Sequence, residues 1–289
     1  LGLHADMGPD DFTGGAVGGM LALLASTSGF PLPVGGAGAM TDALVRRVTE
    51  KGGRIDTGAR VKQVVVREGR VVAVKLESGD ELPARAVLAD TGPGALMLRM
   101  VGEEHLPGSL IESLRKFEYA WGTFKVDFAL DGPVPWTSEA SREAAVVHLS
   151  GDSINDMRAF THEVRAGLLP EQPYLVIGQH TLADPTRAPP GKHTLYVYTH
   201  VPSQLRTPGG WGEARQGFAD RIEQWIERCA PGFRKLVRAR AVTSPVELEA
   251  MNENLVGGDL GGGTSHFERQ LVFRPAFPYF RYRMPIQGL

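Results

Sequence analysis

The sequence has almost no cysteine and no run of positive charge. Cys229 is the single cysteine among 289 residues, so an intrachain disulfide framework and a cysteine-cluster metal site are excluded. This scarcity is typical of a reducing compartment, and we expect a cytoplasmic protein. Lys and Arg total 31 against 33 Asp and Glu, for a net charge of −2. This balance argues against a nucleic-acid partner, because sequence-independent binding needs a clustered positive face.

A hydrophobic run long enough to cross a bilayer is also missing. The longest, Ala16–Ala25, contains two glycines and is far shorter than the roughly 20 residues that a spanning helix needs. Peripheral membrane contact therefore stays open, whereas spanning does not.

Common catalytic and metal-binding motifs are absent as well. The 8 histidines are scattered, and no two have the i, i+4 spacing of a metalloprotease helix. His180, His193 and His200 fall at the ends of predicted strands and could meet in space, but we favour three separate imidazoles and predict no metal site. The sequence contains no G-x-S-x-G nucleophile motif and no phosphate-binding P-loop motif. It assigns no catalytic side chain.

Glycine, in contrast, is abundant, with 36 residues in several clusters. One cluster, Val34–Gly38, begins a degenerate G-x-G-x-x-G pattern that ends in Thr41 rather than glycine. A dinucleotide-binding loop of this type follows a buried strand. Phe30–Pro33 precedes this one, and its two prolines exclude a central strand. From the residues alone, the cluster is a turn followed by a helix cap.

The hydrophobic pattern predicts an α+β protein. Leu1–Gly29 is predicted to be helical with a polar break, and a second helix runs from Met40 to a glycine cap at Gly52. The valine-rich segment Arg60–Asp90 carries two turn signals and predicts an antiparallel meander that ends in a short strand, Ala86–Asp90.

A larger antiparallel sheet with helices is predicted to follow. Phe124, Val126 and Phe128 alternate on one face of a strand, and two further strands are expected at 173–180 and 194–200. Helices are expected after Ser109, which with Glu112 suggests a capping box, after Ser153, and over 218–229, with Cys229 in the core. The arginines of 233–240 are predicted to lie on a solvated helix face, and the tail from Gln270 is predicted to be strand-like.

The order of several segments resembles the phytoene desaturase-like branch of the FAD-dependent amine oxidase superfamily. The resemblance covers nearly the whole chain and rests on Pro31–Leu44 (PLPVGGAGAMTDAL), Gly52–Val64 (GGRIDTGARVKQV), Gly69–Pro93, Asn252–Gly263 (NENLVGGDLGGG) and Phe273–Pro275 (FRP). It implies part of a two-domain FAD-dependent oxidoreductase fold, with a helix and β-meander from the flavin domain and a larger antiparallel-sheet substrate domain.

The resemblance also implies an activity and site residues. FAD would accept a hydride from a C–H bond of an apolar small molecule. The cofactor-binding candidates are Gly35 and Gly36, the strand end Asp90-Thr91, and Val61, whose backbone would meet the adenine. A plain core role for Val61 is equally open. The substrate-cavity candidates are Ala39, Met40, Phe124, Phe128, Gly258 and Asp259, with ordinary core packing as the alternative for the two phenylalanines.

The resemblance divides the chain into a helical segment of the substrate domain (1–33), a partial FAD-binding domain (34–92), the substrate-binding domain (93–265) and a return strand (266–289). The family's N-terminal dinucleotide fingerprint and C-terminal flavin segment have no counterpart here, so we expect an internal piece of a longer enzyme. Two other functions stay open. An amine oxidase would use a lysine near the flavin, but no lysine is assignable to that role, and a binding or scaffold domain would carry no flavin.

Overall fold

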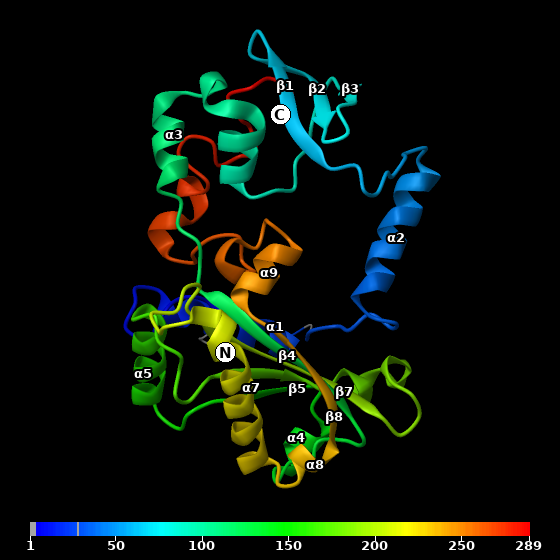
Figure 1. Cartoon of the computed structure of the whole chain (residues 1–289), viewed down its shortest axis with the longest axis vertical. Coiled ribbons are helices and arrows are strands. Elements are labelled where there is room, and N and C mark those ends of the chain that lie inside the picture. Colours follow the sequence, from blue (N-terminus) through cyan, green and yellow to red (C-terminus); the bar gives the residue numbers. More distant parts are fainter. Residues whose placement is uncertain (1–3, 28) are drawn as a thin grey trace. The chain divides into compact units, whose positions relative to one another are not determined.

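The computed structural model describes residues 4–27 and 29–289, and the chain forms two compact units (Figure 1). Unit 1 comprises Leu1–Arg46 and Ala120–Leu260, and unit 2 comprises Arg47–Tyr119 and Gly261–Leu289. Within the described ranges, no helix is long and apolar enough to cross a membrane.

Unit 1 is built on a five-stranded antiparallel sheet in the order β5-β6-β7-β4-β8. The strands are β4 (Gly122–Leu130), β5 (Val146–Leu149), β6 (Leu175–Gly178), β7 (His193–Val201) and β8 (Val237–Thr243). The helices are α1 (Gly14–Thr27), α2 (Ala37–Glu50), α4 (Glu139–Glu143), α5 (Ile154–Arg165), α6 (His180–Ala183), α7 (Gly210–Cys229), α8 (Phe233–Leu236) and α9 (Pro245–Met251), with short 3₁₀ turns η4 (Pro185–Arg187) and η5 (Val256–Gly258). The boundary between the units at residues 46 and 47 falls within α2.

One face of this sheet forms the core of unit 1. Phe124, Val126 and Phe128 of β4 are at most 2% exposed and belong to one cluster with Phe218 and Ile222 of α7. The rings of Phe124 and Phe218 meet edge to face, with their centroids 4.9 Å apart. Burying one such side chain stabilises the fold by about 1.5–3 kcal/mol. The packing of β4 against α7 therefore determines which face of the sheet is buried.

Helix α5 begins where the sequence predicts, at a capping box formed by Ser153 and Asp156. The Ser153 hydroxyl accepts the Asp156 N–H at 3.2 Å, and the Asp156 carboxylate accepts the Ser153 N–H at 2.9 Å. These two bonds satisfy backbone donors that the first turn leaves unpaired. They fix the start of α5 beside the sheet.

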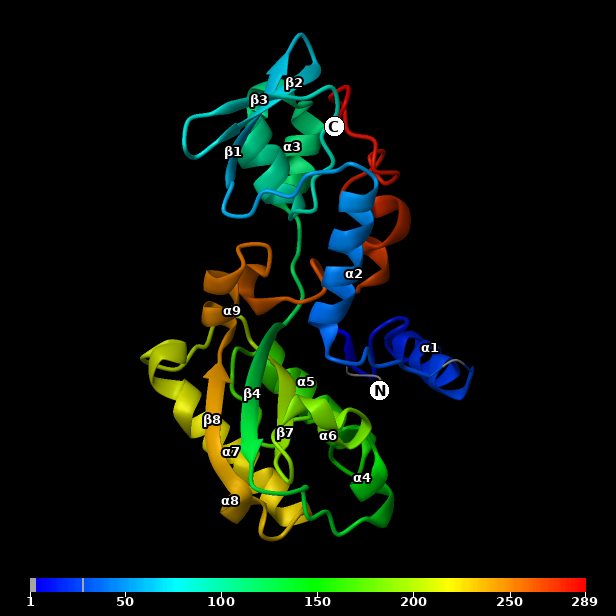
Figure 2. The same ribbon diagram turned by 90° about the vertical axis from the view of Figure 1, so that its right-hand side faces the viewer.

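Unit 2 combines a three-stranded antiparallel meander with a short helical layer. The meander consists of β1 (Val61–Arg67), β2 (Arg70–Leu76) and β3 (Glu81–Pro83). The helical layer is a π-helix, η2 (Ala95–Gly102), with η3 (Glu103–His105) and α3 (Gly108–Arg115), followed late in the chain by η6 (Phe267–Arg269) and η7 (Leu271–Phe273). Figure 2 shows α3 beside the strands, and Leu110 and Leu114 of α3 share a buried cluster with Val64 and Val66 of β1.

The compact units divide the chain differently from the domain bounds that the resemblance implies, and those bounds stay a prediction. The sequence places residues 93–119 with the substrate domain, whereas the structure places them in unit 2. The reason is burial: Met97 and Val101 of the π-helix are each 1% exposed and lie in one cluster with Val71 of the meander. The late boundary lies at 260/261 rather than 265/266.

Several predicted elements differ in the structure. Residues 233–240 form α8 and then β8 instead of one solvated helix, because pairing with β4 outweighs helix propensity. Arg240 of β8 pairs with Asp220 of α7 at 2.7 Å. Helix α3 starts at Gly108 with Pro107 as its N-cap, so Ser109 already lies inside the first turn and does not cap it.

The predicted strands at 86–90 and in the tail are not formed either. Residues 86–90 have no regular structure, although the Val87 N–H donates to the Gly288 carbonyl at 2.7 Å. In the tail, prolines at 275, 278 and 285 lack the N–H that a ladder needs. Strand pairing there is reduced to a single parallel bridge between Arg70 and Gln287.

The α7 layer yields a stability prediction. Replacing Phe218, which is 1% exposed, by alanine should leave a cavity beneath the sheet and lower the free energy of unfolding by about 3–5 kcal/mol. Phe12→Ala is the matched control, because Phe12 is 77% exposed and should change stability by no more than about 0.5 kcal/mol. Urea denaturation measures the free energy of unfolding of both variants. Equal losses of stability would show that the packing of α7 on the sheet does not stabilise unit 1.

Candidate functional site

The second face of the unit 1 sheet carries polar and aromatic side chains. Residues of β7 alternate, so Leu195, Val197 and Val201 enter the core and Tyr198 and His200 take the opposite face. In the register with β4, Tyr198 lies opposite Lys125 and His200 opposite Thr123. The strand that supports the core therefore also displays a row of hydrogen-bonding groups.

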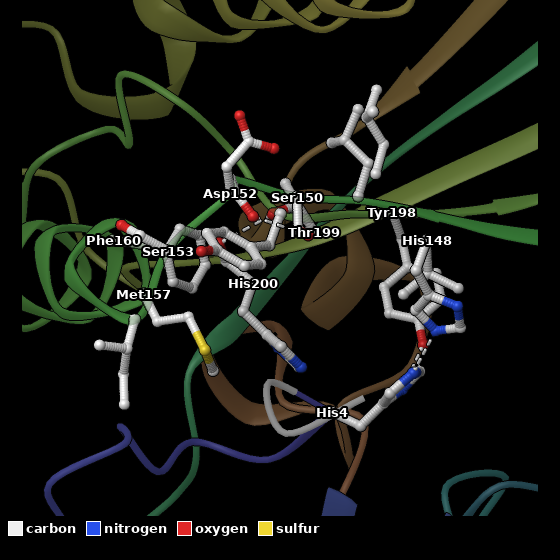
Figure 3. Close-up of a pocket in the computed structure, with 16 residues that line it drawn as sticks. His4, His148, Ser150, Asp152, Ser153, Met157, Phe160, Tyr198, Thr199 and His200 are labelled. Carbon is white, nitrogen blue, oxygen red and sulfur yellow. Dashed lines mark hydrogen bonds between the residues drawn. The ribbon is translucent and has the colours of Figure 1, made fainter. Parts of the chain in front are cut away.

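A cavity of about 330 Å³ opens on this face. Strands β5, β6 and β7 provide one wall, and α5 with the preceding loop 150–153 provides the other. Figure 3 shows His4, His148 and Tyr198 together on one side, Met157 and Phe160 on the other, and His200 between them. The cavity thus has a polar side and an apolar side.

Three of these side chains form a hydrogen-bonded chain. Nε2 of His4 lies 2.7 Å from Nε2 of His148, and Nδ1 of His4 lies 3.1 Å from the Tyr198 hydroxyl. If Tyr198 donates its O–H to His4 Nδ1, His4 carries its proton on Nε2 and donates it to His148. All three groups are then satisfied as neutral species.

Burial keeps these groups uncharged at neutral pH. Burial, together with the nearby His4, lowers the pKa of His148 to about 4. Burial likewise lowers the pKa of His200 to about 4 and that of His4 below its ordinary value, and it raises the pKa of Tyr198 to about 12. The charged forms lose hydration that the cavity does not replace.

Two buried polar atoms in this cavity lack a well-formed hydrogen bond. Nδ1 of His200 and the hydroxyl of Tyr174 have no partner of good geometry in the part of the chain that the structure describes. Tyr174 does lie close enough to the Gly151 amide for that group to lower its pKa, but burial outweighs the effect and raises it. His200 likewise lies close enough to the Gly122 backbone for that group to raise its pKa, and burial again outweighs the effect. Because buried polar atoms are normally paired, both side chains are candidate partners for a ligand.

Unit 2 contains a separate cavity of about 380 Å³ at the turn after the meander. Asp90 and Thr91 line it together with Phe117, Tyr279 and Phe280. The Thr91 hydroxyl is buried and finds no hydrogen-bond partner within residues 4–27 and 29–289. A mainly aromatic and aliphatic pocket with one unsatisfied hydroxyl suits a planar ligand with a polar edge.

Comparison with known protein families identifies the family to which the chain belongs. The sequence model of the flavin containing amine oxidoreductases matches residues 3–213, which is most of the chain. The protein belongs to the flavin-containing amine oxidoreductase family. The cofactor of this family is FAD.

Relatives of known name narrow the family to one branch. The chain is 29% identical over 266 residues to the mouse pyridine nucleotide-disulfide oxidoreductase domain-containing protein 2, covering 88% of this chain and 46% of that protein. It is 25% identical to the lycopene-forming phytoene desaturase of Pseudescherichia vulneris, covering 83% and 48%. The resemblance to the phytoene desaturase-like branch is therefore confirmed. The chain spans about half the length of these relatives.

A solved structure shows the same fold. An oxidoreductase from Methanosarcina mazei superposes with a TM-score of 0.54 at 17% identity, covering 89% of this chain and 48% of that one. The likeness confirms the α+β class and the general architecture of the family.

In this family member, the glycine loop has an internal partner. The Gly35 N–H donates to the Asp184 carboxylate at 2.8 Å, and a Cβ at Gly36 would lie 3.2 Å from the Arg187 guanidinium carbon. Arg187 in turn pairs with Asp184 at 3.1 Å. The Gly35 amide is therefore already paired within unit 1, where the loop docks on Asp184. The place of Gly35 and Gly36 in a cofactor site stays a prediction.

Phe124 and Phe128 also have a different role from the one the resemblance implies. They are 0% and 2% exposed and pack beneath the sheet against α7, so they offer no surface to a ligand. The strand alternation was recognised correctly, but the cavity lies on the opposite face. Core packing, the alternative, describes both residues.

The other predicted residues have no shared site in the structure. Val61 is half-buried at the start of β1, opposite Leu76, and its contact with adenine stays a prediction. On α2, Ala39 is half-buried and Met40 is exposed, and their place in a substrate cavity also stays a prediction.

Gly258 and Asp259 are both buried, and each has a close contact within unit 1. A Cβ at Gly258 would lie 2.6 Å from Pro245 Cα, and the Asp259 carboxylate accepts the Ala120 N–H at 3.0 Å. These contacts hold the segment after α9 against the start of β4, so they explain both residues without a ligand.

Sequence reasoning missed the polar side of the unit 1 cavity. Tyr198 and His200 could have been found, because residues 194–200 alternate and place both on the face opposite the core. His4 and His148 are separated by 144 residues and meet only in the folded chain. No local pattern pointed to that pair. Among the described residues, no group of three or more His, Cys, Asp or Glu side chains is placed to hold a metal ion.

The docking of the glycine loop predicts a local effect. The Thr186 hydroxyl and the Gly35 amide hold the pKa of Asp184 at about 2, below its ordinary 3.8. Asp184→Asn should therefore speed hydrogen exchange of the Gly35 amide by about tenfold or more, because a charge-assisted bond is lost. Asp131→Asn is the control, since Asp131 pairs on the surface with Lys192 and Arg238. Unchanged exchange at Gly35 in D184N would contradict the docking.

The buried imidazole predicts a specific pH response. His200 has a pKa of about 4 when folded against an ordinary 6.5, so between these values the unfolded chain binds the extra proton. Stability should be complete above pH 6.5 and fall by at most about 3 kcal/mol as the pH drops to 4. His200→Asn should remove this part of the slope. NMR titration of the His200 ring tests it directly, and half-titration near pH 6.5 would refute the burial argument.

Proposed function

We propose that the protein is an FAD-dependent oxidoreductase that removes hydrogen from a C–H bond of an apolar substrate. Support comes from its family and from relatives named as carotenoid desaturases. When bound, FAD would supply the hydride acceptor, and the protein would bind and orient the partners and exclude water. The observation that carries the cofactor assignment in this chain is the unsatisfied Thr91 hydroxyl at the strand end of unit 2.

The residues of unit 2 fit such a cofactor. Thr91 offers a hydrogen bond, and the aromatic rings beside it offer flat apolar contact. Asp90 is exposed next to it and can accept hydrogen bonds from a ribityl or ring N–H group. Val61 remains our candidate for the adenine end. Most phosphate contacts would come from a dinucleotide-binding segment like those of the longer relatives.

The substrate side is assigned to the cavity on the unit 1 sheet. Its imidazoles and phenols are uncharged at pH 7, and Asp152 is the one formally charged side chain in its described lining. Asp152 is exposed at the edge of the cavity. A neutral lining suits a neutral, mostly apolar molecule. Because the buried Asp6 and Asp259 lie close enough to His200 to act on its pKa, the preference for a desaturase-like substrate over an amine rests on the named relatives rather than on charge.

The test is flavin binding, measured by the visible absorbance of bound flavin. A form of the protein extended to the length of its relatives should retain FAD, and its flavin should bleach without oxygen when an apolar polyene is added. Thr91→Val should weaken FAD binding by about three- to tenfold, because one hydrogen bond is lost while side-chain shape is kept.

Thr57→Val is the matched control, since Thr57 is an exposed threonine of the same unit. It should leave FAD affinity unchanged. If the extended protein takes up no flavin after reconstitution with FAD, the proposed function is wrong.

A further inference from the structure

We infer that the cavity between β7 and α5 binds a neutral oxygen, a carbonyl or hydroxyl, at the end of an otherwise apolar ligand. His200 and Tyr174 are its hydrogen-bonding partners. This inference deepens the proposed function, on which it rests for the identity of the ligand as substrate. Binding itself needs no flavin and is tested without one.

The first argument is the pair of unsatisfied atoms. Nδ1 of His200 and the hydroxyl of Tyr174 are buried and lack a well-formed partner among the described residues, and both side chains line the same cavity. Leaving buried polar atoms unpaired destabilises a protein. A ligand oxygen at either atom would supply a better-formed bond. Tyr174 can donate to a carbonyl, and an imidazole nitrogen can accept from a hydroxyl.

The second argument is the size and shape of the cavity. At about 330 Å³ it is at the small end of ligand sites. The hydrocarbon side chains of Met157 and Phe160 line it opposite the His4–His148–Tyr198 chain, and Ile154 belongs to the same lining. Such a space accepts the functional end of a long molecule together with a few carbons. It is too small for a whole carotenoid-sized chain.

The third argument is charge. No lysine or arginine belongs to the described lining, and the exposed Asp152 would repel an anion. The internal hydrogen-bonded chain already satisfies Tyr198 and both of its histidines. A carboxylate would enter without a counter-charge and would also meet the field of the buried Asp6 and Asp259, which lie close enough to act on His200. A neutral oxygen meets no such repulsion.

The experiment is calorimetric titration of the full chain, without FAD, with four probes of equal length: 2-decanone, 1-decanol, decane and decanoate. The ketone and the alcohol should bind at least about tenfold more tightly than the alkane and the carboxylate, as expected for two added hydrogen bonds. Equal affinity for decane would overturn the proposal. Preference for decanoate would do the same, because it would require a positive site.

Variants locate the binding. Tyr174→Phe and His200→Leu should each weaken 1-decanol binding by about three- to tenfold and leave decane unaffected. Tyr196→Phe is the matched control: it lies on the same strand and face as His200 but outside the described lining, and should change nothing. Tyr174→Phe keeps the side-chain volume, so it decides alone if His200→Leu does not fold. Unchanged affinity in Tyr174→Phe places the ligand elsewhere and refutes the site.

Failure of this site and failure of the proposed function have different signatures. If the protein binds FAD but binds all four probes equally, the oxidoreductase proposal stands and the proposed end-group site is wrong. If the protein binds 1-decanol through Tyr174 but never takes up FAD, the cavity is a binding pocket and the oxidoreductase proposal is wrong.

Discussion

The packing of α7 against one face of the unit 1 sheet is the constraint on which the candidate substrate site depends. Because side chains alternate along a strand, hiding Phe124 and Phe128 beneath β4 fixes the direction of every neighbour. Tyr198 and His200 are thereby committed to the other face, beside α5. A shift of one residue in the pairing of β4 and β7 would exchange the two sets. The core thus specifies the polarity of the cavity above it.

The same burial sets the chemistry that the cavity can perform. Desolvation removes charge from His4, His148 and His200 at neutral pH and keeps Tyr198 protonated. None of these groups is then a strong acid or a charged partner for a substrate. They are suited to holding and orienting a neutral molecule. These side chains would bind and orient the substrate, which agrees with a family in which the cofactor performs the oxidation.

Local patterns predicted the parts of the fold that depend on neighbours in sequence. The meander and the β4 strand follow from alternation and turn residues, and the start of α5 follows from Ser153. What could not be predicted depends on partners far along the chain. Pairing with β4 turns residues 237–243 into a strand, and His4 meets His148 only through the fold. The face that carries the site required knowing which side α7 covers.

The glycine loop shows how a familiar pattern is completed by a different partner. A backbone N–H in a glycine-rich turn favours an anion, and in dinucleotide-binding proteins that anion is a phosphate. Here the Gly35 amide faces the carboxylate of Asp184, 149 residues away, which Arg187 and Thr186 also hold. The sequence before the loop already argued against a phosphate, since Pro31 and Pro33 exclude the buried strand that would present one. It could not reveal the replacement, because Asp184 reaches the loop only through the fold. The loop is therefore an anion-binding turn whose anion belongs to the protein itself.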